Sequence, residues 1–113
     1  MDGEANDLAA RHCKPCEGCV PPLGQSEVER LLSTLVGWGR SGQELTKTYQ
    51  FRNYDETMAF VNATAWVSRR ENHHPDLEVG FKQCRVRYST HAVGGLSEND
   101  FICAAKIDAL MVL

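Results

Sequence analysis

The sequence predicts an α+β fold in which a four-stranded antiparallel sheet carries three helices packed on one face. Helix start signals and short alternating apolar runs follow one another in the order helix, two strands, helix, two strands, helix. Hairpins interleaved with helices are typical of a sheet that is covered on one side. With 113 residues the chain is long enough for one hydrophobic core and too short for two, so a single domain is expected.

Residues 1–24 are predicted to form an irregular N-terminal arm, and residues 25–113 to form the folded domain. Prolines and glycines interrupt the arm, and its apolar residues show no period. Cys13, Cys16 and Cys19 have the spacing C-x-x-C-x-x-C, which leaves two interpretations open. Either they bind zinc, or the arm is loosely packed with exposed thiols. Structural zinc sites usually take four ligands from two separated pairs, which favours exposed thiols.

The composition indicates in which cell compartment the protein works and which classes of partner are not expected. Cys84 and Cys103 fall in a predicted strand and a predicted helix, where free cysteine packs as a small apolar residue, as in a reducing cytoplasm. The net charge of −3 offers no basic surface to nucleic acid. No apolar run approaches the roughly 18 residues of a membrane span, and the acidic start lacks the features of a signal peptide. We therefore expect a soluble cytoplasmic protein with no membrane partner.

The first helix is predicted over residues 26–35. Ser26 and Glu29 have the spacing of a capping box, in which each side chain satisfies a free backbone donor, and an apolar stripe with helical spacing follows. Glycines then interrupt the pattern. Residues 45–51 alternate between apolar and polar side chains, which predicts a half-buried strand with a short partner around Trp38.

The second helix is predicted from Asn53 to about residue 70, because Asn53 and Glu56 repeat the capping pattern. Pro75 cannot continue a helix, so His73 and His74 fall just beyond its end.

A hairpin is predicted from the two short runs at 77–81 and 84–91. Alternation places the apolar residues of the second run on one side of the sheet and His91 on the other. A glycine pair then leads to Ser97, where Asp100 completes a cap that begins the third helix.

Three of the four histidines, His73, His74 and His91, lie at element ends and are expected to meet in one pocket. An imidazole pKa near 6.5 lets histidine give and take protons near neutrality, so the cluster indicates acid/base chemistry or a metal. Ordinary surface or core histidines are the remaining alternative. Acid/base chemistry is favoured over a metal, because neighbouring side chains diverge at His73 and His74 and no metal-ligand spacing accompanies them.

Two motifs carry a family resemblance. ENHHPDLEVGF and STHAVGGLSENDFICAAKID resemble the signature of the pterin-4a-carbinolamine dehydratases, which pair His-His-Pro with a downstream Thr-His, a glycine turn and Leu-Ser-x-x-Asp. The similarity extends over residues 26–112. It implies the same sheet with three helices, assembly into homodimers or homotetramers, and a hydro-lyase activity.

The implied reaction is dehydration of 4a-hydroxytetrahydropterin (4a-hydroxytetrahydrobiopterin) to quinonoid dihydropterin, in the recycling of tetrahydrobiopterin used by an aromatic amino acid hydroxylase. Loss of water needs an acid for the departing hydroxyl and a base for the N5 proton, and histidines supply both without a metal or other cofactor. By resemblance, His73, His74 and His91 are the acid/base set. The residues implied in substrate binding are Trp38, Pro75, Ser89, Thr90 and Asp100.

One position departs from the family pattern. Some relatives carry a glutamate four residues before the first histidine, where this chain has Arg69, and Glu71 is the nearest carboxylate that could replace it. Eukaryotic members of the family also serve as dimerisation cofactors of homeodomain transcription factors. The resemblance therefore implies a binding module as the alternative function.

Overall fold

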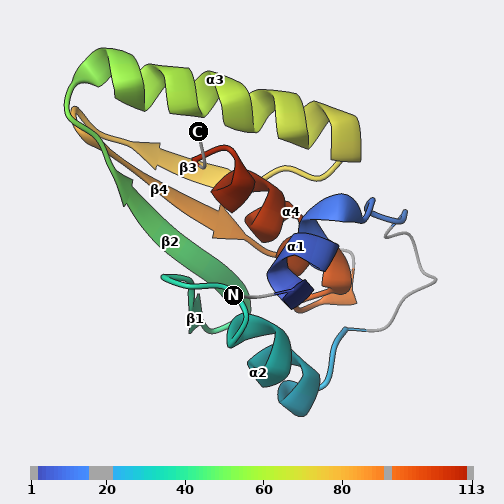
Figure 1. Cartoon of the computed structure of the whole chain (residues 1–113). Helices are drawn as coiled ribbons and strands as arrows, with labels where there is room; N and C mark the ends of the chain where they lie inside the picture. The colour runs from blue at the N-terminus through green and yellow to red at the C-terminus, as the bar shows by residue number, and fades with distance from the viewer. Residues whose placement is uncertain (1–2, 16–21, 91–92, 112–113) are drawn as a thin grey trace.

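The computed structural model describes residues 3–15, 22–90 and 93–111, which form four helices and one four-stranded antiparallel sheet (Figure 1). The predicted α+β class and the predicted sheet are confirmed. The elements are α1 (Gly3–Ala10), α2 (Gln25–Leu32), β1 (Gly39–Ser41), β2 (Glu44–Gln50), α3 (Tyr54–Glu71), β3 (Asp76–Val79), β4 (Gln83–Tyr88) and α4 (Glu98–Ala109).

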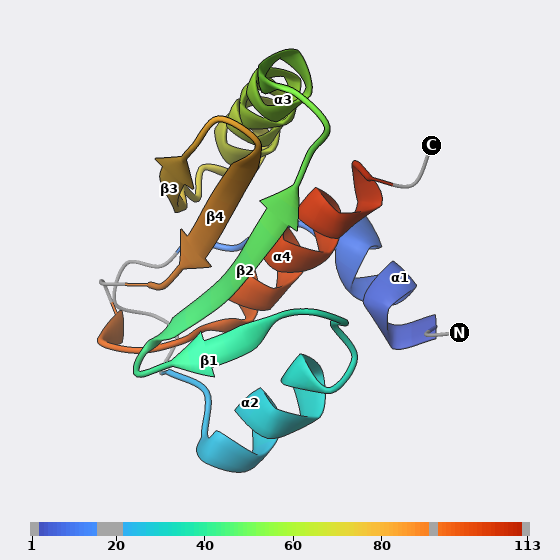
Figure 2. The ribbon, with the colours of Figure 1, turned by 90° about the vertical axis from the view of Figure 1, so that its left-hand side faces the viewer.

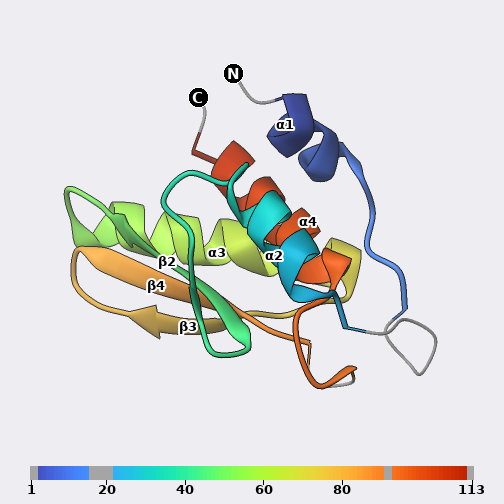
Figure 3. The same ribbon diagram turned by 90° about the horizontal axis from the view of Figure 1, so that it is seen from below.

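The sheet has the order β1-β2-β4-β3, so β2 and β4 are its central strands. Leu45 pairs with Tyr88 and Tyr49 pairs with Cys84, which places all four side chains on one buried face. Figures 2 and 3 show α3 and α4 lying across that face, with α1 against the outer side of α4. The core therefore lies between the central strands and these two helices.

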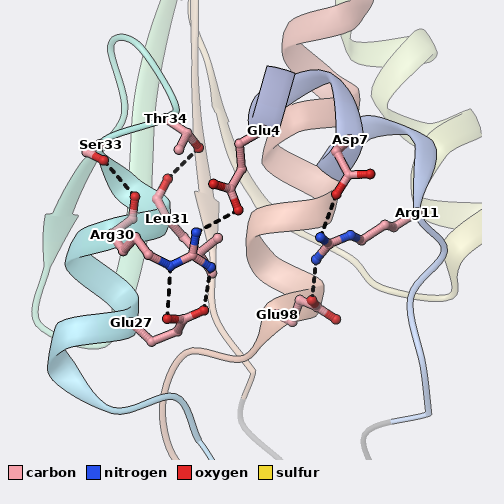
Figure 4. A network of polar contacts seen from close by, with 9 residues as sticks. All are labelled: Glu4, Asp7, Arg11, Glu27, Arg30, Leu31, Ser33, Thr34 and Glu98. Atoms are coloured by element: carbon pink, nitrogen blue, oxygen red, sulfur yellow. Dashed lines mark hydrogen bonds and ion pairs between the residues drawn. The ribbon is translucent and has the colours of Figure 1, made fainter. Parts of the chain in front are cut away.

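Helix α1 corrects the prediction of an irregular arm. Leu8 has no exposed surface and belongs to the core, and Ala5 and Ala9 pack against it. Ion pairs fasten the helix on both sides, from Glu4 to Arg30 of α2 and from Arg11, just past its end, to Glu98 of α4 (Figure 4). A short helix with one buried leucine shows little apolar period, and contact with α4 stabilises it.

The start of α2 also differs from the prediction. The helix begins at Gln25 with Gly24 as N-cap, so the expected capping box of Ser26 and Glu29 does not form. It ends at Leu32, and shorter turns carry the chain to Leu35.

The other two helix starts are confirmed. The side chain of Asn53 accepts a hydrogen bond from the Glu56 amide at 2.8 Å and caps α3. The Ser97 amide donates to the carboxylate of Asp100 at 2.9 Å at the start of α4. Within the described ranges, no helix is long and apolar enough to cross a bilayer.

Candidate functional site

His73 and Asp100 form a buried pair between the end of α3 and the start of α4. His73 Nε2 lies 2.6 Å from Asp100 Oδ1, with His73 only 8 % exposed and Asp100 fully buried. Asn72 ends α3 in the left-handed conformation, which asparagine tolerates better than most residues. The His73 amide then bonds to the Ser68 carbonyl at 3.2 Å, which fixes the backbone where the histidine leaves the helix.

Asp100 is held by donors on its second oxygen. Oδ2 accepts from the Thr90 hydroxyl at 2.7 Å and from the Ser97 amide at 2.9 Å, and the two hydroxyl oxygens of Thr90 and Ser97 lie 2.9 Å apart. A buried carboxylate needs such donors, because it has lost its water. Since both oxygens act as acceptors, the geometry assigns the proton of the His73 ring to Nε2. Nδ1 then carries the lone pair of the ring.

Tyr88 supports His73 from behind. The two rings stack with their centroids 5.7 Å apart and their planes 7° apart. The Tyr88 hydroxyl is buried beside the Cys103 thiol, without a hydrogen bond of normal geometry in the part of the chain that the structure describes. Burial raises the pKa of Tyr88, so the ring presents a neutral face to the histidine.

His74 points to different surroundings from His73. It is exposed and lines a hollow of about 530 Å³ between α3 and β3, which His73 does not line. The hollow is lined by Val61, Thr64, Ala65, Ser68, Arg69, Asn72, His74, Pro75 and Leu77. The expectation that the three histidines meet in one pocket stays a prediction. His91 lies outside the described residues.

No three His, Cys, Asp or Glu residues among those described lie together as metal ligands do. Cys16 and Cys19 lie outside the described ranges, so the zinc interpretation of the arm stays untested.

A family model described as Pterin 4 alpha carbinolamine dehydratase matches residues 21–110. The chain belongs to this family. A Nitrosospira multiformis protein provisionally named pterin-4-alpha-carbinolamine dehydratase is 59% identical over 110 residues, which cover 97% of each chain. A Dechloromonas aromatica protein with the same provisional name is 64% identical over 105 residues, covering 93% of this chain and 94% of the relative.

A solved structure shares the fold. The transcriptional coactivator/pterin dehydratase from Brucella melitensis superposes with a TM-score of 0.76 at 25% sequence identity, covering 79% of this chain and 97% of that one. The family resemblance drawn from the two motifs is therefore confirmed.

Arg69, where this chain departs from the dehydratase pattern, and Glu71, the nearest carboxylate, lie in different surroundings. Arg69 is exposed at the hollow that contains His74. Glu71 is buried and turns toward the N-terminal arm, where it accepts hydrogen bonds from the Cys13 amide at 2.7 Å and from the His12 ring at 3.0 Å. Among the described contacts of Glu71, none joins it to His73 or His74.

Neighbouring hydrogen-bond donors and a cation favour the charged form of the Glu71 carboxyl group. Burial raises the pKa of its carboxyl group, but the hydrogen bonds from Cys13 and His12 and the nearby ammonium of Lys106 outweigh burial. The net result is a pKa below the ordinary value. This contact between Glu71 and the arm was missed from the sequence, because only the fold brings the two segments together.

Trp38 lies in the core rather than at a surface open to a ligand. Its ring is 6 % exposed, its Nε1 donates to both oxygens of Asp108 at 3.1 Å, and its centroid lies 6.3 Å from that of Tyr88. Lys47 and Tyr49 donate to the same carboxylate. Trp38 therefore lies behind Tyr88, and its predicted contact with substrate stays a prediction.

The remaining predicted binding residues divide between two places. Pro75 lines the hollow of His74. Ser89 is half-buried at a smaller hollow of about 270 Å³, whose lining includes Gln43 and the glycine turn. Thr90 lines this second hollow and also bonds to Asp100, so it links that surface to the His73 pair.

Proposed function

We propose that this chain is a 4a-hydroxytetrahydrobiopterin dehydratase, a hydro-lyase that converts 4a-hydroxytetrahydropterin to quinonoid dihydropterin and water. Family membership and the names of its relatives support the reaction class. The observation that carries the proposal is the buried pair of His73 and Asp100, since it orients an imidazole for proton transfer.

The elimination breaks the bond between C4a and the hydroxyl oxygen and forms a double bond between C4a and N5. One group protonates the leaving hydroxyl, and another takes the proton from N5. In the proposal Asp100 holds the His73 ring so that Nδ1 is free to exchange a proton with the substrate. His74 and His91 complete the acid/base set, and His91 follows Thr90 directly in the sequence.

Binding of the flat pterin is proposed at the hollow of His74, beside the end of α3 from which His73 follows. The hollow of His74 falls in the size range of small-molecule sites, about 300–1,000 Å³. Pro75, Ser89 and Thr90 shape the surface over which the pterin approaches. Trp38 supports that surface from the core. In a cell the product would pass to a reductase, so that tetrahydrobiopterin is recycled for an aromatic amino acid hydroxylase.

The test is a coupled assay in which a hydroxylase generates the carbinolamine and its loss is followed. His73→Gln should lower the rate at least about 10²-fold, because an acid/base carrier is removed. His12→Gln is the matched control, since His12 is exposed and its ring bonds to Glu71 rather than to the His73 pair. Equal rates in the two variants would contradict the assignment.

The proposed mechanism uses no metal. Turnover should therefore survive treatment with a chelator. Activity that disappears with the chelator and returns only with zinc would contradict the cofactor-free mechanism.

A second candidate is the binding function suggested by the name of the Brucella melitensis structure, a transcriptional coactivator/pterin dehydratase. By analogy, this chain would act as a dimerisation cofactor through helix surfaces. His73→Gln separates the two functions, because it should abolish dehydration and leave the assembly of a helical partner unchanged. Light scattering would report whether the protein itself is the expected homodimer or homotetramer.

A further inference from the structure

Residues 11–14, which we call the strap, lie across the ends of α3 and α4. Arg11 bonds to Glu98 at 2.6 Å. The Lys14 amide donates to the Asn99 side chain at 3.0 Å, and the Asn99 amide group donates back to the Lys14 carbonyl at 2.7 Å. Figure 4 shows Arg11 between Asp7 and Glu98. The Cys13 amide also donates to the carboxylate of Glu71. Contacts before and after one residue of the strap therefore fix its position.

That residue is Cys13, and its thiol faces the thiol of Cys103. The two sulfur atoms lie 3.5 Å apart, although the residues are 90 positions apart in the chain. Cys103 is fully buried on α4, three residues after Asp100, and Cys13 is half-buried. Cys13 Sγ also lies 3.7 Å from the Asn99 carbonyl oxygen. The sulfur atoms are thus held together by the fold.

We propose that Cys13 and Cys103 are a modification site, at which oxidation forms an intramolecular disulfide that locks the strap to α4. A disulfide requires a sulfur separation of about 2.05 Å, so the thiols must approach by roughly 1.5 Å. Cys13 lies on an irregular segment, which can make this movement without breaking a helix. The proposal does not depend on the dehydratase reaction.

The chemistry is thiol–disulfide exchange with a small disulfide such as oxidised glutathione. The thiolate of one cysteine attacks a sulfur of glutathione disulfide, forms a mixed disulfide and releases one glutathione thiolate. The second cysteine, after losing its proton, attacks the mixed disulfide and releases the other glutathione. Two protein thiols are oxidised, one glutathione disulfide is reduced to two thiols, and the two protons end on the glutathione.

The docked strap slows this reaction. The hydrogen bond with Cys103 and burial both raise the pKa of Cys13, so its thiolate is scarce while the strap is in place. A raised strap exposes Cys13 to solvent and to the oxidant. The rate of oxidation should therefore follow strap opening, and the finished disulfide should prevent reopening.

Locking the strap would act on the segments that carry the His73 pair. Glu71 precedes His73 by two positions, Asn99 directly precedes Asp100, and both bond to the strap. A bond that closes so long a loop restricts the unfolded chain strongly. The oxidised protein should consequently unfold at a higher temperature, by roughly 10 °C or more.

The experiment compares the full chain before and after incubation with oxidised glutathione. Intact mass should fall by about 2 Da, the loss of two hydrogens. Peptide mapping without reductant should join Cys13 to Cys103, and dithiothreitol should reverse both the link and the rise in unfolding temperature. Cys13→Ser should lose the link and the temperature rise, whereas Cys16→Ser and Cys19→Ser should keep both.

Cys13 is the preferred position for the variant, because its half-buried side chain leaves the core intact if Cys103 variants fail to fold. A link from Cys13 to Cys16 or Cys19, a link between two chains, or no link after oxidation would each overturn the proposal. So would a Cys13–Cys103 link that leaves the unfolding temperature unchanged.

Discussion

Replacing Asp100 by asparagine should disable His73 while leaving a folded protein. The carboxylate accepts from the His73 ring on one oxygen and from Thr90 and Ser97 on the other. An asparagine keeps the contacts to Thr90 and Ser97 if its oxygen faces them, and its amide nitrogen then faces His73. That nitrogen is a donor, so the ring must carry its proton on Nδ1 and loses the lone pair assigned to catalysis.

The opposite orientation is worse. With the amide nitrogen toward Ser97, two donors meet in a buried site and the backbone amide at the start of α4 is left without a partner, at a cost of about 1–3 kcal/mol. The first orientation should therefore prevail. Its cost is mainly the loss of one charge-assisted hydrogen bond, about 1.5–3 kcal/mol of unfolding free energy.

For Asp100→Asn, the expected fall in kcat is larger than the loss of unfolding free energy alone would produce. Removal of a correctly oriented acid/base group costs about 10²–10⁴-fold in kcat. The coupled dehydratase assay, run well below the unfolding transition, measures that loss per folded molecule, and urea unfolding measures the stability.

Asp108→Asn is the matched control on the same helix. Asp108 accepts from Trp38, Lys47 and Tyr49, and none of its described contacts is with His73, so its loss should reduce stability and spare the rate. If Asp100→Asn kept a rate within twofold of the unmodified protein, the role of the His73 pair would be refuted.

Three further variants test the N-terminal segment. Leu8→Ala should lower the unfolding free energy by about 2–5 kcal/mol, because it leaves a cavity in the core, whereas Val36→Ala at an exposed position should change it little; equal effects in urea unfolding would show that α1 is not docked. The pKa of Glu71 is lowered from the ordinary value of 4.5, so its stabilising contribution should be complete above pH 4.5 and decline as the pH falls toward the lowered value. Glu71→Gln should flatten the fall in unfolding free energy as the pH drops below 4.5, and an unaltered slope would contradict the contact. His12→Gln should cost no more than about 1 kcal/mol, because the pair with Glu71 is largely exposed on the histidine side, and a larger loss by the same measurement would show a stronger anchor.

The sequence by itself determined the elements whose signals are local. Asn53 caps the amide of Glu56 three residues away, and Asp100 caps Ser97 across the same spacing. The alternation that buries Val86 and Tyr88 is equally short-range. The paired histidines and Leu-Ser-x-x-Asp are also contiguous motifs, so they sufficed to identify the family.

Where two residues could begin a helix, tertiary contacts determined which one is the N-cap. Ser26 and Glu29 have an ideal capping spacing, yet Gly24 is the N-cap of α2. The Leu23 amide bonds to the Leu96 carbonyl at 2.8 Å, which fixes the chain just before that helix. A cap worth about 1 kcal/mol yields to such tertiary contacts.

Only the tertiary structure decided how the N-terminal segment packs and what surrounds His73 and His74. Leu8 is buried because α4 lies beside it, and Cys13 meets Cys103 across 90 positions of chain. His73 and His74 are neighbours in sequence, yet one packs on Tyr88 and the other lines a hollow. Capping and periodicity act within a few residues, whereas burial and long-range pairing depend on which distant segments the folded core brings together.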